Sequence, residues 1–130
     1  MKLKPVLCLA VLGFLLASCN LSGGKVIKAG EESNGQSIEL KADQKLQVSL
    51  AGNPTTGYNW DLVEYDQSVL KQVGDMKYKA DSKLIGSGGV MTFTFEALAS
   101  GNTTIKLIYH RSWETDVPPE KSYELIITVK

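Results

Sequence analysis

Hydrophobic and polar residues alternate with a period of two along most of the chain after residue 25. Met91, Phe93 and Phe95 fall on one face of such a segment, and Thr92 and Thr94 fall on the other. This alternation is typical of half-buried β-strands, because amphipathic helices repeat every 3.6 residues instead. The pattern predicts seven or eight strands, at 26–27, 37–41, 45–50, 58–63, 69–79, 90–98, 103–109 and 122–129. Gly74, inside 69–79, indicates a bulge.

Short strands separated by turns, with no convincing amphipathic helix, predict an all-β fold, an antiparallel β-sandwich. If successive strands from residue 37 onward reverse direction, every second connection lies at the same end. Those connections are 51–57, 80–89 and 110–121, and they have the most unusual compositions in the chain. A rigid sandwich that gathers three such loops at one end is expected to present a binding surface there.

The N-terminal residues follow a different pattern. Lys2 and Lys4 precede an apolar run at 6–17, which is too short to cross a ~30 Å hydrocarbon core as a helix. A basic start, a short apolar run and small residues at its end are typical of a secretory signal. We therefore expect residues 1–18 to be a signal peptide, 19–24 a short tether and 25–130 the folded domain.

The sequence Leu16-Ala17-Ser18-Cys19 resembles the bacterial lipobox, in which the cysteine is acylated and becomes the new N-terminus. The resemblance implies a lipoprotein of the cell envelope, held at a bacterial membrane, on the periplasmic or surface side, by acyl chains such as palmitate on Cys19. Bacterial lipoproteins carry more than one chain, as stable anchoring requires. The alternative is a plain signal peptide cut nearby, with Cys19 an incidental thiol.

Composition and charge exclude several classes of function. Fourteen basic residues balance fourteen acidic ones, so the basic excess of a nucleic-acid-binding protein is lacking. Two cysteines and one histidine are too few for a structural zinc site, and we expect no metal and no cofactor. His110 has no recognisable nucleophile or carboxylate relay beside it in the sequence, so we interpret it as a surface residue at a strand end. A hydrolase is the least favoured alternative.

The first unusual loop contains Asn53-Pro54-Thr55-Thr56-Gly57-Tyr58. Pro54 fixes its own φ angle and pushes Asn53 toward an extended conformation, while Gly57 allows a positive φ. Two small hydroxyl residues therefore lie between two stiff points. This arrangement favours a narrow, rigid, polar wedge used for recognition over an ordinary turn.

The other two loops carry glycines and a pair of binding residues. Gly86-Ser87-Gly88-Gly89 ends the second loop, and its missing Cβ atoms allow another backbone to approach closely. A phosphate-binding loop would need a helix after the glycines, whereas a strand is expected from Val90. The third loop opens with Arg111-Ser112-Trp113, and Arg and Trp are frequent binding hot spots. Alternatively, Trp113 folds back to cover the core.

The three motifs, in this order, resemble the chagasin family of cysteine-peptidase inhibitors, and the similarity extends over about 25–130. The resemblance implies an immunoglobulin-like sandwich that inhibits papain-like enzymes reversibly without being cleaved. The third motif departs from the family at Ser112, where proline is usual. The segment at 81–84 also resembles the family. The first two motifs match at every position: Asn53, Pro54, Thr55, Thr56, Gly57 and Tyr58, then Gly86, Ser87, Gly88 and Gly89.

The resemblance also implies a binding mode. Thr55 and Thr56 would cover the thiolate–imidazolium pair of the peptidase cleft. The segment 86–89 would exchange backbone hydrogen bonds beside the cleft, while Arg111 and Trp113 would clamp the other side, with Trp113 against an aromatic surface. The protein would then be a monomeric inhibitor without catalytic residues. The alternative is an envelope lipoprotein whose sandwich binds another protein or a glycan.

Overall fold

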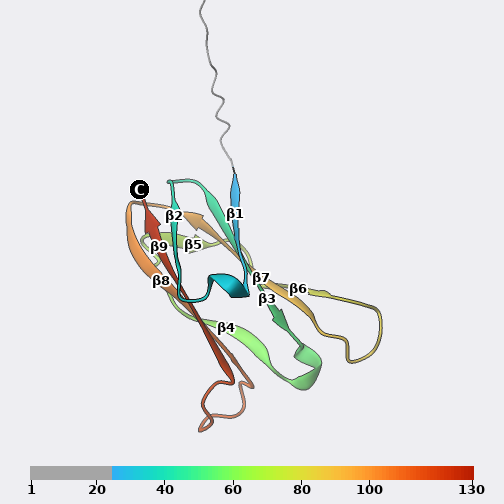
Figure 1. Ribbon diagram of the computed structural model, residues 1–130. Helices are drawn as coiled ribbons and strands as arrows, with labels where there is room; N and C mark the ends of the chain where they lie inside the picture. The colour runs from blue at the N-terminus through green and yellow to red at the C-terminus, as the bar shows by residue number, and fades with distance from the viewer. Residues whose placement is uncertain (1–24) are drawn as a thin grey trace, which may run out of the picture.

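The computed structural model describes residues 25–130, which form a two-layer β-sandwich (Figure 1). The predicted signal peptide, Cys19 and the predicted tether lie outside the described residues. One sheet has the strand order β1-β3-β7-β5, with β6 also paired to β7, and the other has the order β2-β9-β8-β4. The strands are β1 (Val26–Ala29), β2 (Ser37–Leu40), β3 (Lys45–Gly52), β4 (Asn59–Glu64), β5 (Leu70–Gln72), β6 (Lys77–Ala80), β7 (Gly89–Ala97), β8 (Gly101–His110) and β9 (Lys121–Val129).

Helical structure is limited to two short 3-10 helices in the part of the chain that the structure describes. They are η1 (Glu31–Ser33) and η2 (Pro54–Thr56). Residues 25–130 contain no helix that is long and apolar enough to cross a membrane.

The sandwich predicted from the alternation is confirmed, with a different division of one segment. The segment 69–79 forms two strands, β5 and β6, which both pair with β7. Gly74 lies between them with φ of +71°, in the segment 73–76. This segment faces only Phe93 and Thr94 of β7, so the expected bulge is a longer interruption of the strand. The pairing of β4 with β8 also shifts register, between Leu62 and Glu64.

Two of the strand pairs are parallel, although the sequence predicted an antiparallel sandwich. β1 runs parallel to β3, with Val26 opposite Lys45, and β2 runs parallel to β9. Alternation specifies which face of a strand is buried but leaves the direction of its partner open. Because β1 and β3 run together, β1 begins at the end of the sandwich opposite the loop that follows Gly52 (Figure 1).

The core consists of the inward-facing residues of both sheets. Met91, Phe93 and Phe95 of β7 are at most 3% exposed, as the alternation predicted. Ile105 of β8 and Leu125 of β9 are fully buried as well. The buried hydrophobic residues of the described chain lie between Ala29 and Val129.

Tyr123 links the core to the chain around η1 and should make stability depend on alkaline pH. Its hydroxyl donates to the Gly30 carbonyl at 2.9 Å. Burial, with smaller contributions from Glu32 and Glu31, raises the pKa of Tyr123 to about 12. An unfolded tyrosine ionises near pH ~10, so between about pH 10 and 12 the folded protein holds more protons than the unfolded chain. The free energy of unfolding should therefore fall as pH rises through this window.

Urea unfolding of the wild type and of Tyr123→Phe across about pH 9 to 12 measures this effect. The variant is less stable at pH 9 because it lacks the hydroxyl. The stability difference between the two proteins should shrink as the pH rises, since only the wild type must keep a tyrosine protonated. A difference that stays constant up to pH 12 would contradict the assigned pKa.

Candidate functional site

The three unusual loops meet at one end of the sandwich, as predicted. The Asn53 side-chain amide of the first loop donates to the Gly86 carbonyl of the second loop at 3.1 Å. The Arg111 Nε of the third loop donates to the Thr56 carbonyl of the first loop at 3.0 Å. The first loop is thus hydrogen-bonded to both neighbours, and the connections β3–β4, β6–β7 and β8–β9 lie together in Figure 1.

Asn53 organises the first loop. It precedes η2 in an extended conformation, and its side-chain oxygen accepts hydrogen bonds from the Thr55 N–H at 3.1 Å and the Thr55 hydroxyl at 2.5 Å. Its carbonyl accepts from the Thr56 N–H at 3.1 Å and the Thr56 hydroxyl at 2.6 Å. These bonds, with Pro54 at the start of η2, produce the rigid wedge that the sequence predicted.

Thr55 and Thr56 lie at the exposed surface of this wedge. Each hydroxyl has one proton to donate and oxygen lone pairs that accept. Both protons are directed inward to Asn53, so the outer side of each hydroxyl offers acceptor lone pairs. The wedge therefore favours a partner that presents hydrogen-bond donors, such as a protonated imidazole.

Gly57 ends η2 and brings the third loop against the first. Its φ is +88°, in the left-handed region that glycine adopts without a steric penalty. A Cβ at this position would collide with the Trp113 ring, whose Cζ2 would lie only 3.0 Å away. Trp113 itself is 65% exposed and is not part of the core. The alternative in which Trp113 covers the core is therefore wrong, because its ring packs against Gly57.

Arg111 also interacts with the first loop. In addition to its hydrogen bond to Thr56, its guanidinium carbon lies 4.4 Å from the centre of the Tyr58 ring. Its Nη1 approaches the Glu114 carboxylate at 3.8 Å. Ser112, where the related family usually has proline, is exposed in a turn closed by the Glu114 N–H and the Arg111 carbonyl at 3.0 Å. The sequence predicted Arg111 as a clamp on a partner and did not reveal these internal contacts.

The glycines of the second loop allow close approach within this chain. A Cβ on Gly89 would collide with the Lys79 carbonyl of the adjacent strand β6, and Gly89 is buried. The Gly88 carbonyl accepts from the Asp81 N–H at 2.9 Å. The hairpin between β6 and β7 therefore needs these small residues for its own closure.

Of two residues at the tip of the second loop, the sequence noted Leu84 only as part of the segment 81–84 and did not single out Ile85. Leu84 is 77% exposed and Ile85 is fully exposed. Adjacent large apolar side chains in a loop of this size are the signal that could have identified them, since such patches often mark interaction sites. They extend the surface around the wedge with an apolar segment.

His110 is the last residue of β8, at the surface as expected, and it has a carboxylate partner. Its Nε2 is hydrogen-bonded to Asp61 Oδ2 of the neighbouring strand β4 at 2.5 Å. Within residues 25–130, no serine hydroxyl is bonded to this imidazole, and no group of three or more His, Cys, Asp or Glu side chains could hold a metal ion. The pair therefore lacks the nucleophile that acyl-transfer chemistry needs.

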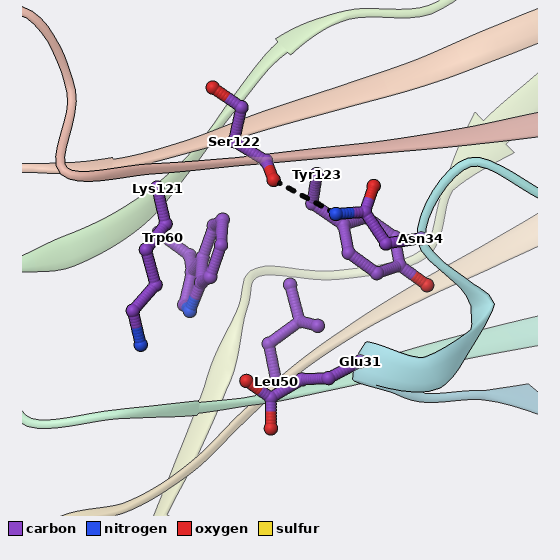
Figure 2. A pocket seen from close by; sticks show the side chains of 7 residues that line it. All are labelled: Glu31, Asn34, Leu50, Trp60, Lys121, Ser122 and Tyr123. Atoms are coloured by element: carbon purple, nitrogen blue, oxygen red, sulfur yellow. Dashed lines mark hydrogen bonds between the residues drawn. The ribbon is translucent and has the colours of Figure 1, made fainter.

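A pocket of about 270 Å³ opens between β3 and β9, beside the loops (Figure 2). Its walls include the rings of Trp60 and Tyr123, with Leu50 between them and Lys121 at one side. Every buried side-chain polar atom in the described chain has a hydrogen-bond partner, so no unpaired group marks this pocket for a ligand. The loop end remains the candidate site.

Comparison with known proteins relates this chain to peptidase inhibitors. The family described as "Chagasin family peptidase inhibitor I42" matches residues 39–127, which include all three loops. Chagasin from Trypanosoma cruzi is 31% identical over 93 residues, covering 68% of this chain and 82% of that protein.

Solved structures agree with this result. The cysteine protease inhibitor EhICP2 from Entamoeba histolytica has a TM-score of 0.73 and 25% identity, over 81% of this chain and 96% of that one. The structure of PbICP-C in complex with falcipain-2 has a TM-score of 0.54 at 22% identity, over 82% of this chain and 98% of that one, which adds support for the fold. Comparison by sequence and comparison by structure thus lead to the same group of proteins.

Replacing Gly57 with alanine should strain the first loop and displace Trp113. The strain of a positive φ costs about 1–2 kcal/mol, and the collision with the indole adds to it. Gly35 provides a matched control, because its φ is +82° and a Cβ added there would have no atom within 4 Å. Gly57→Ala should therefore lower the free energy of unfolding by more than Gly35→Ala does.

Adding Trp113→Ala removes the collision and leaves the strain. In that background the cost of Gly57→Ala should fall to the level of Gly35→Ala, as measured by urea unfolding in a double-mutant cycle. Equal costs of Gly57→Ala with and without Trp113 would show that the indole does not pack against residue 57 in solution.

Proposed function

Because this chain belongs to the chagasin family of peptidase inhibitors, we propose that it blocks papain-like cysteine peptidases reversibly by placing its first loop in the active-site cleft. It is an inhibitor and not an enzyme. The observation that carries this binding mode is the orientation of the Thr55 and Thr56 hydroxyls, whose protons are held by Asn53. Their outward lone pairs suit the imidazolium of a cysteine peptidase, which offers N–H donors next to its thiolate.

The shape of the first loop explains why a peptidase would not cleave the inhibitor. Residues 54–56 form a 3-10 turn that ends at a positive φ. Nucleophilic attack requires a carbonyl held at about 3–3.5 Å from the nucleophile with aligned orbitals. A turn closed by internal hydrogen bonds does not offer an extended backbone for that alignment. The wedge therefore occupies the cleft without being cut.

Neighbouring loops supply the remaining contacts. The exposed Leu84 and Ile85 provide apolar area on one side of the wedge, and the exposed ring of Trp113 provides aromatic area on the other. Arg111 contributes by holding Thr56 and Tyr58 in place. Because these loops are already ordered by internal hydrogen bonds, binding costs less conformational entropy.

Titration of papain with residues 20–130 tests this function, since these residues include every described strand and all three loops. The wild-type domain should inhibit reversibly on dilution and remain uncut. Thr55→Arg should raise the inhibition constant by about 30-fold or more, corresponding to ~2 kcal/mol, because a long side chain on the wedge cannot enter a narrow cleft. The thermal midpoint should fall only slightly, because the variant loses the exposed hydroxyl bond to Asn53 but leaves the core untouched.

Thr55→Ser is the matched control, because it keeps the hydroxyl that donates to Asn53. It should inhibit nearly as well as the wild type. Full inhibition by Thr55→Arg would show that the first loop stays outside the cleft. No inhibition of papain or related peptidases by the wild type would favour the alternative function, a sandwich that binds another protein or a glycan.

We further propose that the inhibitor is a bacterial lipoprotein anchored through Cys19 at the cell envelope, after removal of residues 1–18. The lipobox-like sequence before Cys19 supports this proposal. The position of β1 is compatible with it, because Val26 pairs with Lys45 at the start of β3, whereas the first loop follows the other end of β3. Eight residues of strand separate these ends by about 25 Å, so an anchor before Lys25 would leave the loops free to meet a peptidase.

Cys19→Ala should abolish lipid attachment and leave inhibition unchanged. The reason is that the core and the loops lie entirely within residues 25–130. Mass spectrometry of the mature protein from bacterial membranes measures the acylation, and the papain assay measures the inhibition. An unmodified N-terminus at another residue in the wild type would contradict the lipoprotein proposal.

A further inference from the structure

The end of β3, which carries the first loop, has a strand neighbour on one side only. β7 pairs with β3 as far as Gly52, which lies opposite Gly89. β1 ends where Ala29 lies opposite Val48, and no other described strand continues along this edge. On its other side, the backbone that leads into the wedge therefore has no strand to pair its polar groups.

Two buried aromatic side chains of the opposite sheet supply partners for this backbone instead. The Trp60 indole N–H of β4 donates to the Ala51 carbonyl at 3.0 Å. The Tyr109 hydroxyl of β8 accepts from the Asn53 N–H at 2.9 Å. The two hydrogen bonds thus hold the backbone on both sides of Gly52, across the interior of the sandwich.

The two rings are themselves firmly placed. Trp60 and Tyr109 face each other in the β4–β8 pairing, their ring centres are 5.1 Å apart, and they are 4% and 7% exposed. Gly52 provides the space for this approach, since a Cβ there would lie 2.9 Å from Met91 Cε and 3.4 Å from the Tyr109 ring. Tyr58 also packs on Tyr109, with the two rings stacked and their centres 5.3 Å apart.

We propose that Tyr109 is a positioning residue for inhibition, which acts on the wedge through the hydrogen bond from the Asn53 N–H to its hydroxyl. This inference rests on the proposed function. Asn53 transmits the effect, because its side chain and carbonyl hold Thr55 and Thr56 and its amide holds Gly86. A shift of the Asn53 backbone therefore moves the wedge and the second loop together. The hydrogen bond from Trp60 to the Ala51 carbonyl limits the same backbone shift two residues before Asn53.

The hydroxyl of Tyr109 can be removed with little change in packing. Tyr109→Phe keeps the ring and its contacts with Trp60 and Tyr58 but leaves the Asn53 N–H without its acceptor. That N–H is partly buried, and an unsatisfied buried donor is costly. The loop should therefore tilt to expose it to water, and the inhibition constant for papain should rise about tenfold.

Tyr123→Phe is the matched control. Tyr123 is a second buried tyrosine whose hydroxyl binds the backbone, at the Gly30 carbonyl. Its hydroxyl lies on the Asn34 side of the pocket in Figure 2, whereas Lys121, which borders the third loop, lies on the opposite side. Both variants should lower the thermal midpoint by a similar amount, but only Tyr109→Phe should weaken inhibition.

The experiment measures inhibition constants, thermal midpoints and amide hydrogen exchange at Asn53 by NMR for residues 20–130. In Tyr109→Phe we expect the tenfold weaker inhibition together with faster exchange at Asn53. Inhibition by Tyr109→Phe within about twofold of the wild type, or an equal loss in Tyr123→Phe, would overturn the proposal.

Failure of the proposed function gives a different result. If the wild-type domain inhibits no papain-like peptidase, the proposed function is wrong. Amide hydrogen exchange at Asn53 then tests on its own whether the Tyr109 hydroxyl holds the first loop. Unchanged exchange in Tyr109→Phe would overturn it, because the hydroxyl would then not be holding the loop.

Discussion

The loop end of this inhibitor depends on the hydrogen bonding of one residue, Asn53. Its N–H is bound to a buried tyrosine, its side chain to Thr55 and to the second loop, and its carbonyl to Thr56. Since its backbone and side-chain groups all take part, no one bond can shift without disturbing the others. The three loops therefore form one ordered surface rather than three independent arms.

Two residues of the third loop have an internal role besides the one expected from their type. Arg111 and Trp113 have the residue types of binding hot spots, but both also support the first loop, through Thr56, Tyr58 and Gly57. Arg111 stabilises the shape of the wedge, while the exposed face of Trp113 stays available to a partner. The turn that holds them is closed by the hydrogen bond from the Glu114 N–H to the Arg111 carbonyl.

The sandwich supports this loop surface and places it at the end of the domain opposite Val26. The end of β3 is fixed by β7 on one side and by aromatic residues of the opposite sheet on the other. Pairing of β1 parallel to β3 places Val26 at the far end of the domain. A chain anchored before β1 would thus hold the loops away from its point of attachment.

The sequence by itself determined which residues are buried, where most strands lie and which loops gather at one end of the sandwich. Alternation with a period of two identifies the inward face of β7 and of its neighbours. Pro54 fixes its own φ angle, and Gly57 permits a positive φ. The tertiary structure alone decided the parallel pairing of β1 and β2, the exposure of Trp113, and the contacts of Arg111 and Tyr109 with the first loop. The Arg111–Thr56 contact spans 55 positions of the sequence, and the Tyr109–Asn53 contact spans 56. Whether they form depends on strand register and on the approach of the two sheets, and neither is encoded by local patterns.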